Sequence, residues 1–429
     1  MLRRAVPIST QPVKHSFGVL RPAVAPSWTR CLATVHPSPL ITEPPPVRGS
    51  MPPNHVARVG RLTTFALPQE VVGSQSDLSL GQRMIDTWRK DGIFQIFLTP
   101  AQGAMLRRAF KSSKGFFRRP YEEKAKHVDD RSFSGYIASG EELTDGVADY
   151  SEIFTVTKDL PPTDPRVQAK WPCHGPCPWP DANYATTMKD LMTLLGESGE
   201  KLLKLTALGL GLGDPNALTK LTEDGWHHMR VLRFPQVDRT NGKGKAGRGI
   251  GSHTDYGLLV IAGQDDVGGL FIRRPMDGEK LHNWEKSAAG FKENDENWTY
   301  VPPVENTLTV FPVCSHILGD MMQYLTRDHL PSTPHKVGLN TRERYAFAYF
   351  HEPNFSSVVK PLRDYGHEAS NDKPGIHYGT HFTNMFMRNY PERITAKRVK
   401  AENRMQILKD IANEALGPAR DAAGASVAM

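Results

Sequence analysis

The amino-acid sequence predicts an α+β protein whose core is a β-sandwich or barrel flanked by helices. Long helical patterns dominate the first half of the chain, and a run of short strand patterns begins at residue 227. Of the 429 residues, 39% are hydrophobic, so the chain is long and apolar enough to bury a sizeable core.

Helices and strands alternate before residue 210. We expect helices at residues 79–90, 100–117 and 181–210, and strands at 62–67, 93–97 and 150–156. The longest helix should pack against a sheet, because its apolar side chains recur at helical spacing. They are Met188, Leu191, Met192, Leu195, Leu202, Leu205 and Leu208.

The rest of the chain is expected to form short strands and then two helices. The strands lie at residues 227–234, 258–261, 270–272, 299–301, 308–311 and 344–350, and the helices near 382–388 and 402–415. We therefore divide the chain into an extension (1–61), a helical and β region (62–224), a strand-rich core (225–354), a C-terminal helical region (355–415) and a frayed tail (416–429).

Basic residues are concentrated in the N-terminal extension. Residues 1–61 contain eight Lys or Arg, one acidic residue and eleven Pro, and the remainder carries 45 basic and 45 acidic residues. The net charge of +7 therefore belongs to the extension, and nucleic-acid binding is not expected. The extension is either a targeting leader or a disordered tail. We expect a cytoplasmic protein, with mitochondrial targeting as the alternative.

Apolar runs and cysteines bear on two further classes of protein. The sequence has no apolar run of about 18 residues, so no membrane span is expected. Cys173 and Cys177 are separated by a Pro-containing spacer and no second pair follows, so we interpret them as structural. Four cysteines in so long a chain fit a reducing compartment. We expect a monomer.

Residues 248–261 carry the most informative motif. His253 and Asp255 are two residues apart and can bind one metal ion if the backbone between them is a strand end or turn. A second histidine, His335, follows 82 residues later, just before another predicted strand. Two histidines and one carboxylate on one face of an iron ion leave positions open for substrate and oxygen. The motif alone is weak, because the chain has 16 histidines.

An arginine nine residues beyond His335 strengthens this hypothesis. Alternation along strand 344–350 places Arg344, Ala346, Ala348 and Phe350 on one face. If that face points inward, it forms a slot for a short dicarboxylate held by a bidentate arginine. Arg230 shares a face with His228, Leu232 and Phe234 and is a second candidate inward-facing cation. The alternative for each arginine is a structural salt bridge or an outward-facing side chain.

These motifs resemble the 2-oxoglutarate- and Fe(II)-dependent oxygenases of the isopenicillin-N-synthase-like group. Within that family the chain most resembles the microbial ethylene-forming enzymes. The resemblance runs from about Thr63 to about Asn403 and includes Trp88–Gln95, Tyr136–Glu142, Trp171–Pro176, Gly225–Pro235, Gly249–Ile261, Ser332–Val337 and Phe382–Arg388. It implies a double-stranded β-helix, or jelly-roll, core flanked by helices, with the dioxygenase core at residues 225–354.

The resemblance also implies a set of site residues. The iron ligands would be His253, Asp255 and His335. Arg344 would pair with the far carboxylate of the co-substrate 2-oxoglutarate, in an apolar sleeve with Arg230 nearby, formed by Phe311, Phe350, Ala346 and Ala348. L-Arginine would be held by residues that match the family pocket: Glu142, Thr144, Arg230, Tyr256, Asp320, Arg388 and Tyr390.

The implied activity uses Fe(II), with ascorbate as an additional reductant, to convert 2-oxoglutarate and O2 to ethylene and CO2 in the presence of L-arginine. A parallel reaction would form succinate while hydroxylating L-arginine. One alternative is a 2-oxoglutarate-dependent hydroxylase of arginine or another small cation, without ethylene. Another is a binding or sensing protein that retained the fold, which the complete ligand set opposes.

Three positions depart from the family pattern. Ala346 stands where a serine that contacts 2-oxoglutarate is usual, and Asn389 replaces a common cysteine. The segment Val313–Leu318 is inserted between Phe311 and Asp320, where the family runs directly on. If the insertion shifts these two residues, ethylene formation is affected before iron binding.

Overall fold

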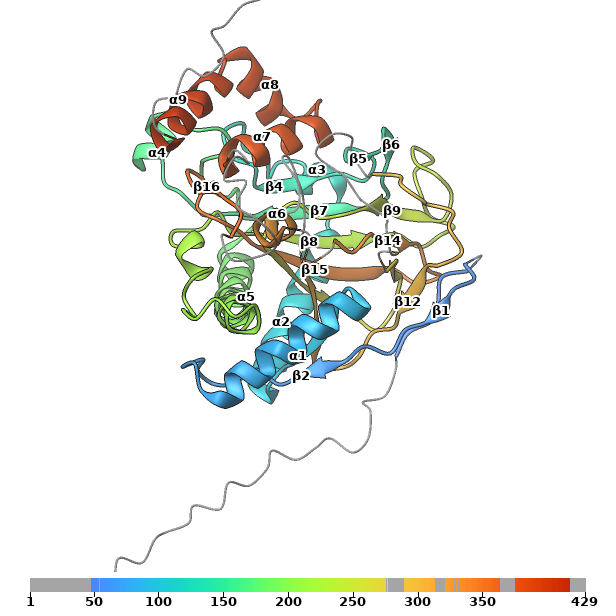
Figure 1. The fold of residues 1–429 in the computed structure, drawn as a ribbon. Coiled ribbons are helices and arrows are strands. Elements are labelled where there is room, and N and C mark those ends of the chain that lie inside the picture. The colour runs from blue at the N-terminus through green and yellow to red at the C-terminus, as the bar shows by residue number, and fades with distance from the viewer. Residues whose placement is uncertain are drawn as a thin grey trace, which may run out of the picture. The chain divides into compact units, whose positions relative to one another are not determined.

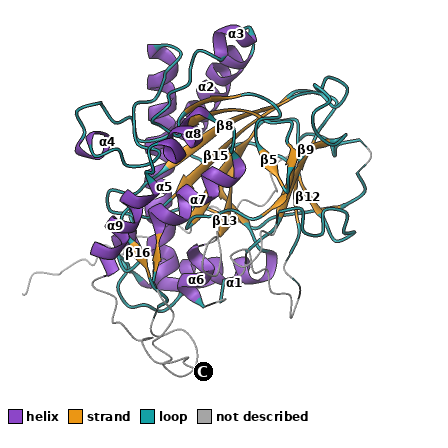
Figure 2. Ribbon diagram, turned by 90° about the horizontal axis from the view of Figure 1, so that it is seen from above, coloured by secondary structure: helices purple, strands orange, loops and turns teal. Residues whose placement is uncertain are grey.

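Two β-sheets form the centre of the protein (Figures 1 and 2). A computed structural model describes residues 48–53, 55–274, 276, 289–312, 321–327, 329–330, 332–362 and 375–416. The eight-stranded sheet has the order β2-β3-β13-β10-β15-β8-β7-β4, and the five-stranded sheet the order β1-β12-β11-β14-β9.

The strands of the larger sheet are β2 (Thr64–Phe65), β3 (Phe94–Phe97), β4 (Gly135–Ile137), β7 (Glu152–Val156), β8 (His228–Phe234), β10 (Leu259–Gln264), β13 (Thr307–Pro312) and β15 (Arg344–His351). Those of the smaller sheet are β1 (Arg58–Val59), β9 (Arg248–His253), β11 (Leu270–Ile272), β12 (Thr299–Val301) and β14 (His335–Gly338). Two short pairs complete the described strands: β5 (Leu143–Thr144) with β6 (Val147–Ala148), and β16 (Val358–Val359) with β17 (Ile376–His377).

Strands β8 to β15 build the predicted jelly-roll core. Four of them, β8, β10, β13 and β15, lie in the larger sheet, and β9, β11, β12 and β14 lie in the smaller one. The chain therefore passes repeatedly between the sheets, as a double-stranded β-helix requires. An apolar cluster drawn from both sheets includes Val260, Leu270, Val301, Phe311 and Phe350. The predicted fold class is confirmed.

Three long helices pack together beside the larger sheet: α1 (Gln75–Asp91), α2 (Pro100–Phe117) and α5 (Ala182–Gly209) (Figure 1). Helix α5 contacts β10 and β15, as predicted for its apolar stripe. Met188, Leu191, Leu195, Leu202, Leu205 and Leu208 are buried, whereas Met192 is only partly buried. None of the described helices is both long and apolar enough to cross a bilayer.

The helix ends follow their sequence signals. Ser74 caps α1 in a reciprocal capping box with Asp77, and Thr99 does the same for α2 with Gln102. Helix α1 ends at Gly92, whose φ of 78° lies in the left-handed region that glycine adopts without strain.

The remaining helices are short or lie near the C-terminus. They are α3 (Tyr121–Lys124), α4 (Pro165–Gln168), the 3-10 helix η1 (Thr219–Leu221), α6 (Met321–Thr326), α7 (Tyr378–Asn389), α8 (Ile394–Ala401) and α9 (Met405–Leu416). Helices α7 and α9 correspond to the two predicted C-terminal helices, whereas the patterns did not predict α6 and α8.

Residues 48–61 were assigned to the extension, but contacts join this segment to the smaller sheet and to the loop before β13. Arg48 forms an ion pair with Glu305, and β1 pairs in parallel with β12. The Gly60 N–H also bonds to the Tyr300 carbonyl. Within this segment, β1 is a two-residue edge strand, whose register is set by pairing and not by an apolar pattern of its own. Residues 1–47 and the expected tail at 417–429 lie outside the described residues, as do Asp320 and the insertion Val313–Leu318.

The described residues on either side of residues 224 and 354 belong to one compact unit. Strands β4 and β7 of the first segment extend the sheet that contains β8 and β15. The first half of the chain therefore completes one wall of the jelly-roll.

Helices α1 and α5 touch at a pair of glycines, and this contact yields a stability prediction. A Cβ on Gly81 would lie 2.4 Å from the Leu205 carbonyl oxygen and 2.9 Å from the Gly209 nitrogen. We expect Gly81→Val to lower the free energy of unfolding by about 1–3 kcal/mol, because both helices must move apart. Urea denaturation measures the change.

A matched control is Gly115→Ala in α2, where an added Cβ meets nothing within 4 Å. This substitution should stabilise the protein by roughly 0.5–1 kcal/mol, because alanine loses less backbone entropy on folding. Equal stability of Gly81→Val and the wild type would contradict the close helix contact.

Candidate active site

The three predicted metal ligands meet at one end of the smaller sheet. His335 at the start of β14 pairs directly opposite His253 at the end of β9, and Asp255 follows two residues later. Asp255 Oδ1 lies 3.7 Å from His253 Nε2, and Asp255 Oδ2 lies 3.3 Å from His335 Nε2. The imidazole centroids are 4.3 Å apart, with ring planes tilted by 54°.

Both histidines have their Nε2 atoms available to a metal ion. His253 Nδ1 lies 2.8 Å from the Gly251 carbonyl oxygen, and His335 Nδ1 lies 3.2 Å from that of Thr333. A carbonyl only accepts, so each Nδ1 carries the proton and each Nε2 presents a lone pair. Burial, followed by the neighbouring His335, lowers the pKa of His253 to about 3, which keeps it neutral as ligation requires. This donor set fits Fe(II).

A second cluster of possible ligands, formed by Glu200, His227 and His351, does not fit a metal ion as it stands. The two rings stack with centroids 4.2 Å apart and planes within 10°. A ligating lone pair lies in its ring plane, so stacked parallel rings cannot direct both lone pairs at one ion. His227 Nδ1 also accepts the Glu352 N–H at 3.0 Å, which leaves its proton on Nε2.

A narrow cavity of about 70 Å³ extends from the ligand cluster between the two sheets. The predicted alternation of β15 is confirmed, because Arg344, Ala346, Ala348 and Phe350 all line it. Phe311 contributes to the same wall, with its ring centroid 5.0 Å from that of His335. The cavity thus runs from the metal ligands to a buried cation, past small and apolar side chains.

Arg344 is held at the far end of this cavity with part of its hydrogen-bonding capacity unused. Its side chain is buried, and its Nη2 donates to Gln264 Oε1 at 3.1 Å. Its Nε has no partner among the described residues. Burial lowers the pKa of Arg344, and the charge of Asp265 partly opposes this shift. A carboxylate would satisfy the unused donors and offset the burial of the charge.

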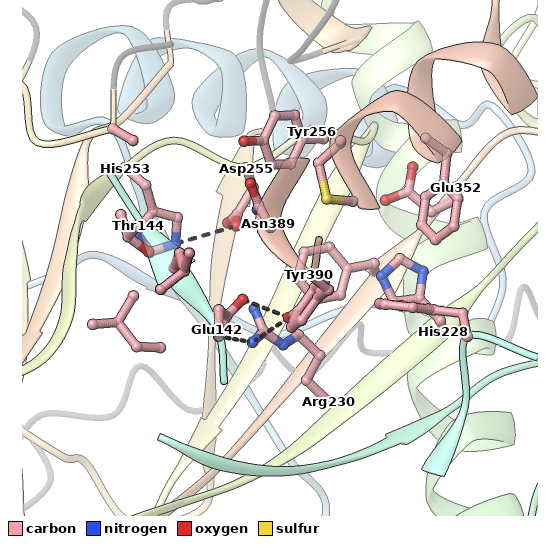
Figure 3. Close-up of a pocket in the computed structure, with 17 residues that line it drawn as sticks. Glu142, Thr144, His228, Arg230, His253, Asp255, Tyr256, Glu352, Asn389 and Tyr390 are labelled. Carbon is pink, nitrogen blue, oxygen red and sulfur yellow. Dashed lines mark hydrogen bonds and ion pairs between the residues drawn. The ribbon is translucent and has the colours of Figure 1, made fainter. Parts of the chain in front are cut away.

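A second cavity, of about 50 Å³, adjoins the first (Figure 3). The two share Arg230, Ile250, His253, Asp255 and Phe350 in their walls. The other lining residues come mainly from the β5 segment, β8 and α7: Phe133, Glu142, Leu143, Thr144, His228, Tyr256, Ala289, Glu352, Phe382, Met385, Asn389 and Tyr390. A molecule in this cavity would therefore contact the metal site.

Glu142, Arg230 and Tyr390 form the polar end of the second cavity (Figure 3). Arg230 forms an ion pair with Glu142 and donates to Tyr390 Oη at 3.1 Å, and Tyr390 donates to Glu142 at 2.5 Å. Burial opposes the charge of Arg230, but Glu142 more than compensates and raises its pKa. Arg230 Nε has no partner among the described residues. The N–H at Arg230 Nε is therefore available to donate a hydrogen bond to an anionic ligand.

Glu142 already accepts hydrogen bonds from Arg230, Tyr390 and the Ser151 hydroxyl. An ionised carboxylate offers about four acceptor sites. The guanidinium of a ligand can therefore bind the remaining acceptor site of Glu142. It can also displace the guanidinium of Arg230, which is now paired with this carboxylate.

The other predicted pocket residues lie at different distances from the ligands. Thr144 and Tyr256 line the second cavity. Arg388 does not line either cavity; it is exposed and donates to Tyr256 Oη at 2.9 Å from the outside. The roles of all these residues stay predictions.

Several residues at the site were not predicted, and three of them carry polar side chains that bear on its chemistry. Gln264 contacts Arg344, Glu352 lines the second cavity, and Asp149 lies behind Thr144. Burial raises the pKa of Glu352 to about 8, and its carboxylate occupies the space that a Cβ on Gly257 would fill. An isolated carboxylate or amide outside any recognised motif is a weak signal, so the sequence alone does not identify these three residues.

Comparison with known proteins agrees with this geometry. Residues 226–353 match the 2OG-Fe(II) oxygenase superfamily, and residues 65–182 match the N-terminal region of the non-haem dioxygenases in morphine synthesis. A 2-oxoglutarate-dependent ethylene/succinate-forming enzyme of Ralstonia nicotianae is 54% identical over 341 residues, which cover 79% of this chain and 94% of that protein. A homoarginine-6-hydroxylase of Glycine max is 30% identical over 67% of this chain and 82% of that protein.

Solved structures show the same fold. A full-length Neurospora crassa protein, in complex with alpha-KG, superposes with a TM-score of 0.60 at 21% identity, covering 76% of this chain and 95% of that chain. Together with the ligand cluster and the arginine-ended cavity, these similarities show that the chain belongs to the 2-oxoglutarate- and Fe(II)-dependent oxygenase superfamily and is a 2-oxoglutarate-dependent dioxygenase.

Proposed function

We propose that this dioxygenase converts 2-oxoglutarate and O2 to ethylene and CO2 in the presence of L-arginine, and hydroxylates L-arginine in a parallel succinate-forming reaction. The ethylene reaction balances as one 2-oxoglutarate and one O2 giving one ethylene, three CO2 and one water. The observation that carries the proposal is the buried Glu142 carboxylate, next to the metal ligands, in a chain 54% identical to an ethylene/succinate-forming enzyme.

His253, Asp255 and His335 would hold Fe(II), which when bound supplies the redox chemistry with O2. The chain orients the two imidazoles through the backbone carbonyls of Gly251 and Thr333, so that each Nε2 faces the metal site. Because the three ligands occupy one face, the opposite face is left to small molecules.

Arg344 would orient 2-oxoglutarate along the narrow cavity by pairing with its far carboxylate. Phe311 and Phe350 exclude water from the walls, and Ala346 and Ala348 leave space between them. In such a dry site a charge-assisted pair is stronger than in water.

The second cavity would hold L-arginine. Glu142 offers a carboxylate to the guanidinium, while the unpartnered Arg230 Nε offers a donor to a carboxylate. Thr144, Tyr256, Asp320, Arg388 and Tyr390 would complete the set, although Asp320 lies outside the described residues and Arg388 lies on the outer side of Tyr256.

A second candidate is hydroxylation of arginine or a related cation without ethylene formation. The similarity to a homoarginine-6-hydroxylase and the carboxylate of Glu142 favour it, because both are compatible with a guanidinium substrate. The products distinguish the two. Ethylene together with succinate supports the first function, and succinate with hydroxylated arginine alone supports the second.

Removal of a metal ligand should abolish both reactions. We expect Asp255→Ala to produce neither ethylene nor succinate, because the metal loses its only carboxylate ligand from the cluster. Headspace gas chromatography and succinate analysis measure the products, and metal analysis measures bound iron. The control is His351→Asn in the stacked cluster, which should still bind one iron per chain. Either product at wild-type level from Asp255→Ala would contradict the assignment.

The paired N–H donors of the Arg344 guanidinium should set the affinity for 2-oxoglutarate. We expect Arg344→Lys to raise the KM for 2-oxoglutarate by about 10- to 100-fold, because lysine keeps the charge but loses the paired donors. Arg233→Lys is a matched control, since Arg233 pairs with Glu152 and Glu343 away from both cavities. An unchanged KM in Arg344→Lys would rule out this role for Arg344.

The Glu142 carboxylate should set the response to L-arginine. We expect Glu142→Gln to raise the KM for L-arginine by about 10- to 100-fold, while the KM for 2-oxoglutarate changes much less. Glu343→Gln, which removes the carboxylate paired with Arg233, should leave both constants near wild type. If Glu142→Gln raises the KM values for L-arginine and 2-oxoglutarate by equal factors, the substitution disturbs the residues shared by the two cavities and does not act specifically on arginine binding.

A further inference from the structure

Asp149 joins the segment that carries Glu142 and Thr144 to the strand that carries His253. Its side chain is fully buried. Its N–H donates to the Glu142 carbonyl at 3.0 Å, and its Oδ2 accepts the Thr144 hydroxyl at 2.5 Å. Both the main chain and the side chain of Asp149 are therefore bonded to residues of the second cavity's wall.

The other oxygen of Asp149 contacts the metal-ligand strand. Asp149 Oδ1 accepts the Gly251 N–H at 3.1 Å. The carbonyl of the same Gly251 accepts the Nδ1 proton of His253 at 2.8 Å. A relay of hydrogen bonds thus runs from Thr144 through Asp149 and Gly251 to His253.

The guanidinium of Arg248 contacts two residues of this relay, Asp149 and Thr144. Its Nη2 lies 3.4 Å from Asp149 Oδ1 and donates to the Thr144 carbonyl at 2.6 Å. The guanidinium packs so closely on Gly251 that a Cβ there would lie 2.0 Å from Nη2. A side chain at position 251 would therefore displace the Arg248 guanidinium, so the relay is confined by packing as well as by hydrogen bonds.

We propose that Asp149 is a positioning residue that couples ligand binding at Glu142 and Thr144 to the orientation of His253, and thereby to metal affinity. This inference rests on the proposed arginine pocket. Outer partners that orient a ligating imidazole commonly change metal affinity by about 10- to 100-fold when they are removed. A ligand that orders Thr144 also orders Asp149, and so stabilises the ligating geometry of His253.

Electrostatics is consistent with this role. Burial, followed by the charge of Glu142, raises the pKa of Asp149 to about 7. Two carboxylates, Glu142 and Asp149, face two guanidinium groups, those of Arg230 and Arg248. A cationic ligand at Glu142 changes the balance of charge in this group, so Asp149 is sensitive to ligand binding.

Linkage provides the test. If the two sites are coupled, L-arginine must tighten metal binding by the same factor by which the metal tightens arginine binding. We would titrate the full-length protein with Mn(II) by calorimetry under nitrogen, at saturating 2-oxoglutarate, with and without L-arginine. In the wild type we expect a factor within the roughly 5- to 150-fold range typical of coupled sites.

Three variants test the relay. Asp149→Ala removes it, and should lower Mn(II) affinity by about 10- to 100-fold and bring the coupling factor close to unity. Asp149→Asn keeps an oxygen that accepts the Gly251 N–H, and its amide N–H can donate to the Thr144 hydroxyl oxygen in place of the present bond, so it should restore part of both. Asp77→Ala removes a buried acid in the α1 capping box, and controls for loss of stability alone. It should leave the coupling factor unchanged.

Each outcome decides the inference. Equal coupling in the wild type and Asp149→Ala overturns it, as do equal losses in Asp149→Asn and Asp149→Ala, because charge alone would then explain the effect. If the wild type does not bind L-arginine, the proposed arginine pocket fails. Loss of Mn(II) affinity in Asp149→Ala but not in Asp77→Ala then still supports the relay to His253, and unchanged Mn(II) affinity overturns it.

Discussion

The pairing of β9 with β14 is the constraint on which the site depends. It places His335 opposite His253 although 82 residues separate them in the chain, and it carries Asp255 to the same end of the sheet. Cross-strand neighbours are held within a few ångströms by the hydrogen bonds of the sheet, so the ligand distance is set by the backbone. A one-residue slip would move one histidine to the other face.

The site also depends on how its buried charges are compensated. Arg344 is buried and Arg230 is mostly buried, with 14% of its side chain exposed, and an unpaired charge is strongly unfavourable in such surroundings. Arg230 is paired with Glu142, whereas Arg344 donates to the neutral amide of Gln264 and lies in the electrostatic field of Asp265. This difference separates the two cavities chemically. The cavity at Arg344 contains a cation without a carboxylate partner and suits an anionic ligand. The cavity at Arg230 contains an ion pair and suits a zwitterionic ligand.

Hydrogen bonds to the backbone orient the ligands within this frame. The carbonyls of Gly251 and Thr333 set the tautomers of His253 and His335, and Asp149 in turn binds the Gly251 N–H. By contrast, the cluster of Glu200, His227 and His351 also has two histidines and one carboxylate. Its two imidazole rings are stacked, however, and cannot direct their nitrogens at one ion. Two histidines and a carboxylate close together are therefore not sufficient for a metal site, because the imidazole rings must also be oriented toward one ion.

Much of the fold and part of the site could be predicted from the chain. Helical spacing located α1, α2 and α5, because apolar side chains must form one stripe per helix. Alternation along β15 located the four side chains that share one cavity wall. Strand β9 was not predicted, since Arg248-Gly-Ile-Gly-Ser-His253 has two glycines and no alternating pattern. It is a strand because β14 pairs with it.

By itself, then, the sequence determined the long helices, most strands of the core, the face of Arg344 and the three ligand types, since these follow from local periodicity and side-chain chemistry. Only the tertiary structure decided that residues 48–61 join the sheet as an edge, that Arg230 occupies Glu142, and that Asp149 lies behind the ligand strand. These contacts join residues far apart in the chain. They arise from packing and pairing that no local pattern encodes.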